Sequence, residues 1–320
     1  MLVPLHIEGS PPPWGQTLQR LAGETMGTSW SVALIGPQPL SHAPLYAAIE
    51  ALFSDVIAQM SHWDSSSLLS RFNRAAPGAR VLLPPGFADV MDAALQIAAA
   101  SDGAFDPTAG ALVQHWGFGP PADGQEDDAQ RGWAALRWDA PTRSIEQPGG
   151  LRLDLSAIAK GHAVDRLAGL LTDLGLPHHL AEVGGELRGA GLKPDGQPWW
   201  VDFEPPAADA DVLPLRLALH GLAIATSGDY RRFRIDADGR RQSHTVDPRR
   251  GEPIAHGLAS VSVVHESAMW ADGWSTALMV MGLDAGLAFA TAHGLAARFL
   301  QRQDGGYAER FSPALEALLS

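Results

Sequence analysis

The segment LRLDLSAIAKGHAVDRLAGLLTDLG, residues 151–175, joins two kinds of secondary-structure pattern without a gap. Its first five residues alternate leucines with Arg152 and Asp154, a period of two that predicts a β-strand with one buried face. After Ser156 the apolar residues recur at helical spacing, and serine is a common N-cap residue. Gly175 supplies a helix stop. The segment therefore predicts a strand that runs directly into an amphipathic helix.

The first turn of that expected helix contains Lys160 and Gly161. Free N–H groups at a helix start, a nearby lysine and little side-chain bulk together favour a phosphate or another anion. On this interpretation Gly161 leaves room for a ligand to approach. A strand-to-helix junction that binds nothing is the alternative, because many such junctions have no ligand.

The composition is that of an acidic globular protein. The 320 residues are 46% hydrophobic and 18% charged, which allows a large core and excludes general disorder. Lys and Arg number 23 against 36 Asp and Glu, a net charge of −13 that argues against a nucleic-acid partner. A phosphorylated ligand must therefore be bound locally, by a metal ion or by helix ends.

Two absences in the sequence exclude further classes. The chain has no cysteine, which excludes disulfides, thiolate metal sites, a cysteine nucleophile and a lipid-anchor cysteine within it. No run of about 18 apolar residues occurs, so we expect no membrane span. The opening MLVPLHIEGSPPPWG lacks the features of a signal peptide, and the sequence as it stands is that of a cytoplasmic protein unless a leader lies outside it.

The order of patterns along the chain mixes strands and helices without a βαβ alternation. Residues 1–20 are expected to be a flexible arm and residues 21–320 one domain with room for two lobes. Residues 120–130 are expected to form a solvated acidic loop. The order favours an α+β fold with largely antiparallel sheets over a doubly wound fold. Strands are expected from Leu21 to Gly36 with a bulge at Met26-Gly27-Thr28, before the pair Gly184-Gly185, within 198–222 and at 258–264, and helices at 43–60, 86–101, from Asp272 and at 284–294.

A carboxylate and a hydroxyl are spaced for metal binding in ADGWSTALMVMG. If a helix begins near Asp272, then Asp272 and Thr276 lie one turn apart on one face and offer oxygen ligands to a hard cation such as Mg²⁺. The alternative is purely structural. Asp272 would then stabilise the helix dipole, and the Thr276 hydroxyl would bond back to the chain.

Three other residues have both a functional and a structural interpretation. His244, in SHTVDPRRG, could act as a general acid or base or contact a phosphate, but a lone surface histidine is the common alternative. Trp63 stands in a serine-rich loop, where it would cover a planar ligand or plug the core. Met26 is either exposed at the bulge or part of the core. The motifs G-x-x-x-x-G-K-[ST], G-x-G-x-x-G, G-x-S-x-G and H-E-x-x-H are all absent.

Eight blocks in order resemble the ApbE family of FAD:protein FMN transferases, over residues of about 22 to 295. They are ETMGTSW, SHWDSSSLLSRFN, DGAFDPTAG, LDLSAIAKGHAVD, EVGGELRGAG, ATSGDY, SHTVDPRRGEPI and ADGWSTALMVMG. The resemblance implies a T-fold-like architecture with an FAD cleft between lobes. It also implies an enzyme that, with Mg²⁺, transfers FMN from FAD to a Thr or Ser hydroxyl of a target flavoprotein and releases AMP.

The resemblance also assigns roles by motif. Asp272 and Thr276, with the main-chain carbonyl of Ala157, would hold the metal. His244, Lys160 and Asp272 would be the catalytic residues, with His244 at the reacting phosphate. The residues expected to contact FAD are Met26, Trp63, Ala104, Phe105, Asp106, Asp154, Lys160 and Ile254.

The sequence departs from the family pattern in places, and two rival functions stay open. Ser156-Ala157 replaces a common Gly-Gly, and His162 stands where tyrosine is frequent. Family members are often exported or membrane-anchored, whereas this sequence shows neither leader nor anchor, so localisation stays open. A Mg²⁺-dependent FAD pyrophosphatase would use the same site with water as acceptor. A non-catalytic FAD-binding protein is the second rival, and it is disfavoured because Asp272 and Thr276 would have no purpose in it.

Overall fold

The computed structural model describes residues 7, 9–121, 132–206, 212, 214–230, 233–235 and 241–318. Residues 1–6 and 8 of the predicted arm 1–20, and residues 122–130 of the predicted acidic loop, lie outside these residues. None of the helices in the described ranges is both long and apolar enough to cross a bilayer. The helices are α1 (His42–Met60), α2 (Leu68–Asn73), α3 (Pro85–Ala100), α4 (Gly110–His115), η1 (Trp133–Ala135, a 3-10 turn), α5 (Ala159–Asp173), α6 (Ala268–Met281), α7 (Leu283–Ala292) and α8 (Pro313–Glu316).

An eight-stranded antiparallel sheet in the order β1-β2-β6-β7-β10-β15-β16-β17 is the centre of the fold. Its strands are β1 (Thr17–Thr25), β2 (Thr28–Gly36), β6 (His179–Val183), β7 (Glu186–Ala190), β10 (Leu222–Gly228), β15 (Leu258–His265), β16 (Ala296–Gln303) and β17 (Gly306–Phe311). Smaller sheets contain β3 (Arg80–Leu82), β4 (Arg137–Asp139), β5 (Ser144–Glu146), β8 (Trp199–Asp202), β9 (Arg216–Leu219), β11 (Phe233–Ile235), β12 (Arg241–Ser243), β13 (Val246–Asp247) and β14 (Glu252–Pro253).

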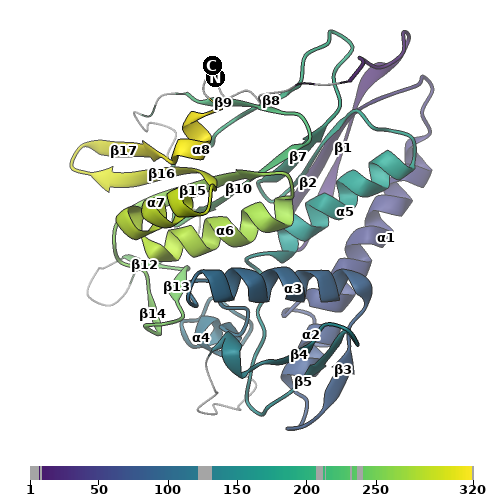
Figure 1. Ribbon diagram of the computed structural model, residues 1–320. Coiled ribbons are helices and arrows are strands. Elements are labelled where there is room, and N and C mark those ends of the chain that lie inside the picture. The colour runs from purple at the N-terminus through teal and green to yellow at the C-terminus, as the bar shows by residue number, and fades with distance from the viewer. Residues whose placement is uncertain are drawn as a thin grey trace.

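Helices α1, α5 and α6 cover one face of the main sheet, which we call the helical face (Figure 1). Trp30 of β2 is fully buried there, with its ring 5.8 Å from that of Phe53 on α1. Val164 and Leu167 of α5 belong to the same cluster. Burial of each such side chain is worth about 1.5–3 kcal/mol, which explains why the apolar stripes of these helices settle against the sheet.

The opposite face of the sheet is covered as well, because side chains on a strand alternate between its two sides. Ala33 and Ile35 of β2 lie on this second face and belong to a cluster with Trp199 of β8 and Leu217 of β9. β8 and β9 pair with each other in a separate two-stranded sheet. The central strands of the main sheet are therefore buried on both faces, and β15 in particular is apolar or buried along most of its length. The edge strands β1 and β17 stay partly exposed.

Helix α3 connects the main sheet to a smaller lobe. It runs below α6, and the strands β3, β4 and β5 lie beyond it (Figure 1). Phe87 and Met91 of α3 are fully buried in one cluster with Ile145 of β5. Contact with α6 is close, because a Cβ at Gly273 would lie 2.4 Å from Cδ1 of Ile97. This packing fixes the distance between the small lobe and the metal-binding residues expected on α6.

The structure corrects the expected strand at the start of residues 151–175. Residues 151–155 are extended, but only Arg152 forms a bridge, to Ala109. Leu153 instead pairs its main chain with the Asn73 side chain, at 2.8 and 2.9 Å, and the Asp154 N–H donates to the Pro107 carbonyl. Within the described residues no named strand pairs with this segment, so the alternating pattern reflects burial of the leucines and not membership of a sheet.

The helix after this segment starts later than predicted. Helix α5 begins at Ala159 and its N-cap position is Ile158, so Ser156 is not the cap. The Ser156 N–H donates instead to Asp154 Oδ1 at 2.8 Å and closes a turn. The predicted stop is correct, since the helix ends at Asp173 and Gly175 has φ +78°.

Two further expectations need correction. Met26 and Gly27 are not a bulge but the two-residue turn of the β1–β2 hairpin, with φ values of 50° and 71°. The strand before them begins at Thr17 rather than Leu21. Helix α6 begins at Ala268, four residues before Asp272, so Asp272 lies in the second turn and away from the N-terminal dipole.

The expected fold class is confirmed, since helices pack on a large antiparallel sheet. Helices α1, α3 and α7 and strand β15 begin and end within two residues of the expected bounds.

Candidate active site

A cavity of about 1050 Å³ lies where the main sheet, α5, α6 and the small lobe meet. It brings together residues from every part of the chain that the sequence singled out. Ile254 is the exception, because it does not appear among the described lining residues, and its N–H donates to the Thr245 carbonyl. The predicted site residues that line the cavity are Met26, Trp63, Ala104, Phe105, Asp106, Asp154, Ala157, Lys160, His244, Asp272 and Thr276.

One lysine and two carboxylates form the charged centre of this cavity. Lys160 Nζ donates to Glu186 Oε1 at 2.5 Å and lies 3.9 Å from Asp272 Oδ1. The side chains of Glu186 and Asp272 are only 4% and 5% exposed. The second oxygen of Glu186, Oε2, is buried and accepts no hydrogen bond from the part of the chain that the structure describes. Two buried carboxylates thus share a single ammonium group, which leaves negative charge uncompensated.

The pKa values of both carboxyls reflect that imbalance. Burial raises the pKa of Glu186 to about 7, with Lys160 opposing the shift and Asp272 adding to it. Burial likewise raises the pKa of Asp272, against the effects of Lys160 and of the Gly161 N–H. An additional cation at this position would stabilise both ionised carboxylates.

The close packing of α5 on α6 places Lys160 beside Asp272. A Cβ at Gly161 would lie 2.2 Å from the Ala268 carbonyl oxygen, so only glycine permits this approach. The sequence suggested that Gly161 leaves room for a ligand. In the structure it instead leaves room for helix α6. Its N–H also donates to Asp272 Oδ2 at 3.0 Å, which fixes the carboxylate.

Asp165, one turn along α5, caps the N-terminus of α6. Its carboxylate accepts hydrogen bonds from the Ser267 hydroxyl and from the N–H groups of Ala268 and Met269, at 2.6 to 3.0 Å. Arg188 of β7 donates to the same carboxylate at 2.5 Å. The cap satisfies N–H groups that would otherwise be unbonded and sets the register of α6.

The donor set expected for a metal is a mixture of oxygens. Asp272 and Thr276 are one turn apart on α6 and both line the cavity, as does Ala157 in the turn before α5. Ser227 of β10 lies 3.0 Å from the Thr276 hydroxyl. Among the residues that the structure describes, no cluster of three or more His, Asp or Glu could hold a metal. One carboxylate, a hydroxyl and a carbonyl beside uncompensated charge nevertheless fit Mg²⁺, which takes few protein ligands and keeps waters.

The loop after α1 presents an exposed aromatic ring to the cavity. Trp63 is 61% exposed, which excludes the alternative that it plugs the core. The neighbouring His62 Nδ1 lies 3.3 Å from Asp154 Oδ2. Burial lowers the pKa of His62, but the Asp154 carboxylate more than offsets this and the pKa lies above its ordinary value. Burial raises the pKa of Asp154, and His62 and Ser156 outweigh it, so this carboxyl is ionised.

Residues 104–106 form part of the cavity wall. Ala104 and Phe105 are buried, and both oxygens of Asp106 are used within the protein. Its Oδ1 accepts from the N–H and hydroxyl of Thr108, and its Oδ2 accepts from the Trp133 N–H. Burial raises the pKa of Asp106 despite these bonds. Asp106 therefore maintains the shape of the wall.

His244 follows β12 and lines the cavity. Its ring lies 6.2 Å from that of Phe118 in an edge-on arrangement. The preceding strand is anchored through Arg241, whose side chain donates to the Asp229 carbonyl, while Arg302 of β16 pairs with the Asp229 carboxylate. This network ties the segment before His244 to the end of β10.

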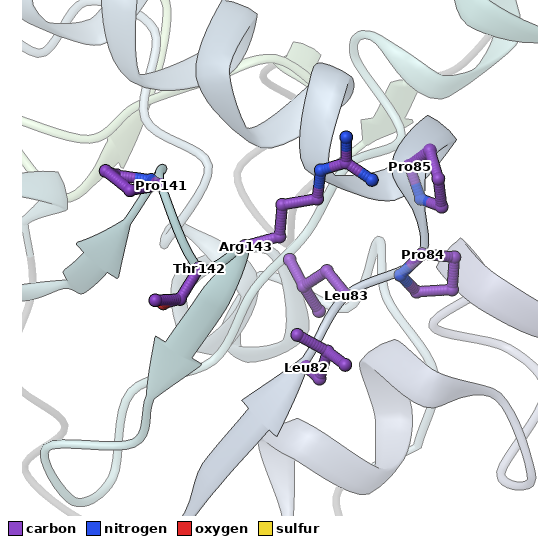
Figure 2. Close-up of a pocket in the computed structure, with 7 residues that line it drawn as sticks. All are labelled: Leu82, Leu83, Pro84, Pro85, Pro141, Thr142 and Arg143. Atoms are coloured by element: carbon purple, nitrogen blue, oxygen red, sulfur yellow. The ribbon is translucent and has the colours of Figure 1, made fainter.

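A second hollow, of about 540 Å³, lies in the small lobe between β3, α3 and the turn before β5 (Figure 2). None of the predicted site residues lines it, and Arg143 is its one ionisable side chain among the described residues. The chemistry expected from the sequence is therefore assembled in the larger cavity alone.

Comparison with known proteins agrees with this geometry. The sequence profile of the ApbE family matches residues 26–299, which is most of the chain. This chain belongs to the ApbE family. The sequence-based expectation of ApbE membership is thereby confirmed.

Two sequence relatives in the ApbE family are both named FAD:protein FMN transferase. The protein from Salmonella typhimurium is 34% identical over 314 residues, covering 94% of this chain and 89% of the relative. The protein from Vibrio cholerae serotype O1 is 37% identical over 311 residues, covering 94% and 92%.

Solved structures of ApbE proteins share the fold over nearly the whole chain. The apo flavinyl transferase ApbE of Pseudomonas stutzeri superposes with a TM-score of 0.85 at 36% identity and covers 95% of this chain and 97% of that one. The flavin transferase ApbE of Vibrio cholerae gives 0.83 at 33% identity, with 95% and 100% covered.

Four residues of the site were not predicted from the sequence: His62, Asp165, Glu186 and Ser227. All four stand within the ApbE-like blocks SHWDSSSLLSRFN, LDLSAIAKGHAVD, EVGGELRGAG and ATSGDY, which was the available signal. Their roles depend on partners in distant segments, such as Lys160 for Glu186, and no local pattern indicates such a pairing.

Proposed function

We propose that this ApbE protein transfers FMN from FAD to a Thr or Ser hydroxyl of a target flavoprotein and releases AMP. The carrying observation is the placement of Lys160, Asp272 and Thr276 together in one cavity with Trp63 and His244. In this reaction the hydroxyl oxygen bonds to the FMN phosphorus, the bond between the two phosphates breaks, and AMP departs with the electron pair. The hydroxyl proton must pass to a base.

Two kinds of residue in the cavity would bind FAD, apolar side chains for the flavin ring and a lysine for the diphosphate. Trp63 and Met26 offer apolar surface for the flavin ring. Ala104 and Phe105 add apolar wall, and Asp106 and Asp154 are the carboxylates beside them. Lys160 supplies positive charge for the diphosphate in an otherwise acidic site. Orientation of the two phosphates is the main requirement, because phosphoryl transfer depends on alignment and charge neutralisation.

Mg²⁺ would be held by Asp272, Thr276 and the main-chain carbonyl of Ala157. When bound it supplies charge neutralisation to the phosphates. The uncompensated negative charge at Glu186 and Asp272 supports a cation at this place. The Gly161 N–H and the Asp165 cap hold Asp272 in position before any ligand binds, so little reorganisation is needed.

His244 is proposed as the base that accepts the proton of the acceptor hydroxyl. It lines the cavity near Phe118, and a neutral imidazole is suited to this transfer near pH 7. Lys160 and the metal already supply positive charge to the phosphates, so a cationic histidine would add less than a base.

Mass spectrometry of candidate flavoproteins, after incubation with the enzyme, FAD and Mg²⁺, tests the proposal. A mass increase equal to an FMN phosphoester on a Thr or Ser is the expected result. If the enzyme releases FMN and AMP at the same rate with and without each candidate acceptor protein, and no acceptor gains mass, the enzyme is an FAD pyrophosphatase. FAD binding without turnover would identify a flavin-binding protein.

A further inference from the structure

The cavity continues past the end of the β6–β7 hairpin onto the face of the sheet opposite the helices. Glu186 points to the helical face, where Lys160 pairs with it. Glu182, Leu187 and Ile224 lie directly opposite one another across β6, β7 and β10, and their side chains point to the other face. All three line the same cavity as the charged centre.

We call this part of the cavity the strand-face chamber, lined by Glu182, Leu187, Phe203, Glu204, Ile224 and Thr226. Its floor and one wall are apolar. The chamber also contains the carboxylates of Glu182 and Glu204, and each accepts a hydrogen bond from a hydroxyl group. Ser31 donates to Glu182 at 2.7 Å, and Tyr230 donates to Glu204 at 3.0 Å. The chamber therefore combines apolar surface with hydrogen-bond acceptors.

This chemistry does not suit the anionic part of a dinucleotide. Among the described residues that line the cavity, Lys160 is the only lysine or arginine, and it lies on the helical side. The strand-face chamber contributes the negative charges of Glu182 and Glu204, which would repel phosphate. Carboxylates instead accept hydrogen bonds from the N–H groups of a polypeptide, and an apolar floor receives a small side chain.

The cavity measures about 1050 Å³, at the top of the range of about 300–1,000 Å³ that is usual for small-ligand pockets. Between its two parts lies the turn Gly184-Gly185. A Cβ at Gly184 would come within 3.0 Å of Thr28 and 3.3 Å of Lys160, so the absence of side chains keeps this crossing open.

Resting on the proposed transferase function, we infer that the strand-face chamber binds the acceptor protein. Its occupant is an extended segment, neutral or basic beside the reactive residue, whose Thr or Ser hydroxyl reaches across Gly184-Gly185 to the FMN phosphate. FAD would occupy the helical side at the same time. The balance of the reaction is that given above, with the hydroxyl proton accepted by His244.

A steric plug tests this inference. Leu187→Trp would fill the chamber, and Leu180→Trp is a matched control, because Leu180 lies on the same face of β6 outside the described lining. The measurements are the FAD dissociation constant by flavin fluorescence, FMN release without acceptor, and transfer rate against concentration of the acceptor identified by the FMN mass increase. We expect Leu187→Trp to raise the acceptor KM at least about tenfold, with FAD affinity and FMN release unchanged.

A crosslink supplies an independent measurement. A benzophenone amino acid at position 187, irradiated with FAD and the acceptor present, should attach to acceptor residues next to the flavinylated Thr or Ser. Crosslinking to FAD, or weakened FAD binding in Leu187→Trp but not in Leu180→Trp, would overturn the inference. Unchanged acceptor KM in Leu187→Trp would overturn it while the transferase function stands. If no protein gains FMN while FAD still binds, the proposed function fails and the inference with it.

Discussion

The backbone N–H of Gly161 donates to Asp272 Oδ2 at 3.0 Å and so joins the first turn of α5 to the second turn of α6. The bond depends on the absence of a side chain at Gly161, where a Cβ would lie 2.2 Å from the Ala268 carbonyl oxygen. One residue therefore sets both the separation of the two helices and the orientation of the carboxylate proposed to hold Mg²⁺.

Gly161→Ala should force α5 and α6 apart and destabilise the protein by about 1–3 kcal/mol, the usual cost of overpacking. The free energy of unfolding from urea titration, with Mg²⁺ affinity from calorimetry, checks this. Gly169→Ala is the control, because a Cβ there meets nothing within 4 Å on the same helix. That variant should be stabilised by about 0.5–1 kcal/mol. Equal stability of the Gly161 variant and wild type would contradict the packing argument.

Asp272→Ala should abolish metal-dependent turnover while the fold survives. Loss of one hard ligand removes charge neutralisation at the phosphates, plausibly ~3 kcal/mol or more of transition-state stabilisation. Transfer rates across a Mg²⁺ titration measure the effect. Asp284→Ala, in the first turn of α7, is the control and should behave as wild type. Undiminished Mg²⁺-dependent transfer by Asp272→Ala would remove this residue from the metal site.

Glu186→Gln should make stability less dependent on pH. The pKa of Glu186 is raised to about 7 from the 4.5 of an unperturbed glutamate, so folding is favoured by the protonated form. The stability associated with this form is fully present below pH 4.5 and is lost as pH rises through 7. Glutamine imitates the protonated form at every pH. The variant should match wild type at low pH and exceed it at pH 8, by on the order of 1–3 kcal/mol.

Melting temperatures of both proteins between pH 4 and pH 8, without metal, measure this difference. Glu182→Gln, on the neighbouring strand, is the control and is measured over the same range. A Glu186→Gln curve parallel to that of wild type would show that the carboxyl is ionised throughout.

FAD should bind at least about tenfold more tightly than NAD, because the exposed ring of Trp63 and the side chain of Met26 offer apolar surface for the flavin. Trp63→Ala should lose most of this preference. Calorimetry with each dinucleotide measures it, and Trp14→Ala, a fully exposed tryptophan outside the described lining, is the control. Comparable affinities of the wild type for both dinucleotides would count against a flavin site.

His244→Asn should retain FAD affinity and lose transfer by about 10²–10⁴-fold, the usual worth of acid–base catalysis. As a base His244 must be neutral, so the wild-type rate should rise with pH over the range in which histidines ordinarily lose their proton. FAD titration of the variant and a wild-type pH–rate profile test both statements, with His293→Asn as control. A rate that falls between pH 6 and 8 would make His244 a cationic contact, and lost FAD binding would make it a ligand contact.

Local patterns in the sequence determined the positions and bounds of several helices and strands. Helical spacing set α1 and α3 within a residue of their observed bounds, and alternation set β15 equally well. The eight ordered blocks identified the ApbE family, and the site residues predicted from them, Ile254 excepted, line one cavity. Such patterns succeed because helix and strand periodicities are set by backbone geometry and need no distant partner.

Only the tertiary structure decided features that depend on partners far along the chain. Residues 151–155 have a strand pattern, yet their main chain bonds to Asn73, 80 residues away, so no ladder forms. Helix α6 starts at Ala268 because Asp165, more than 100 residues earlier, satisfies its first N–H groups. Glu186 reaches Lys160 only because β7 packs on α5. Hydrogen bonds and ion pairs depend on which residues lie close together in the folded protein. The periodicity of a single segment contains no information about that proximity.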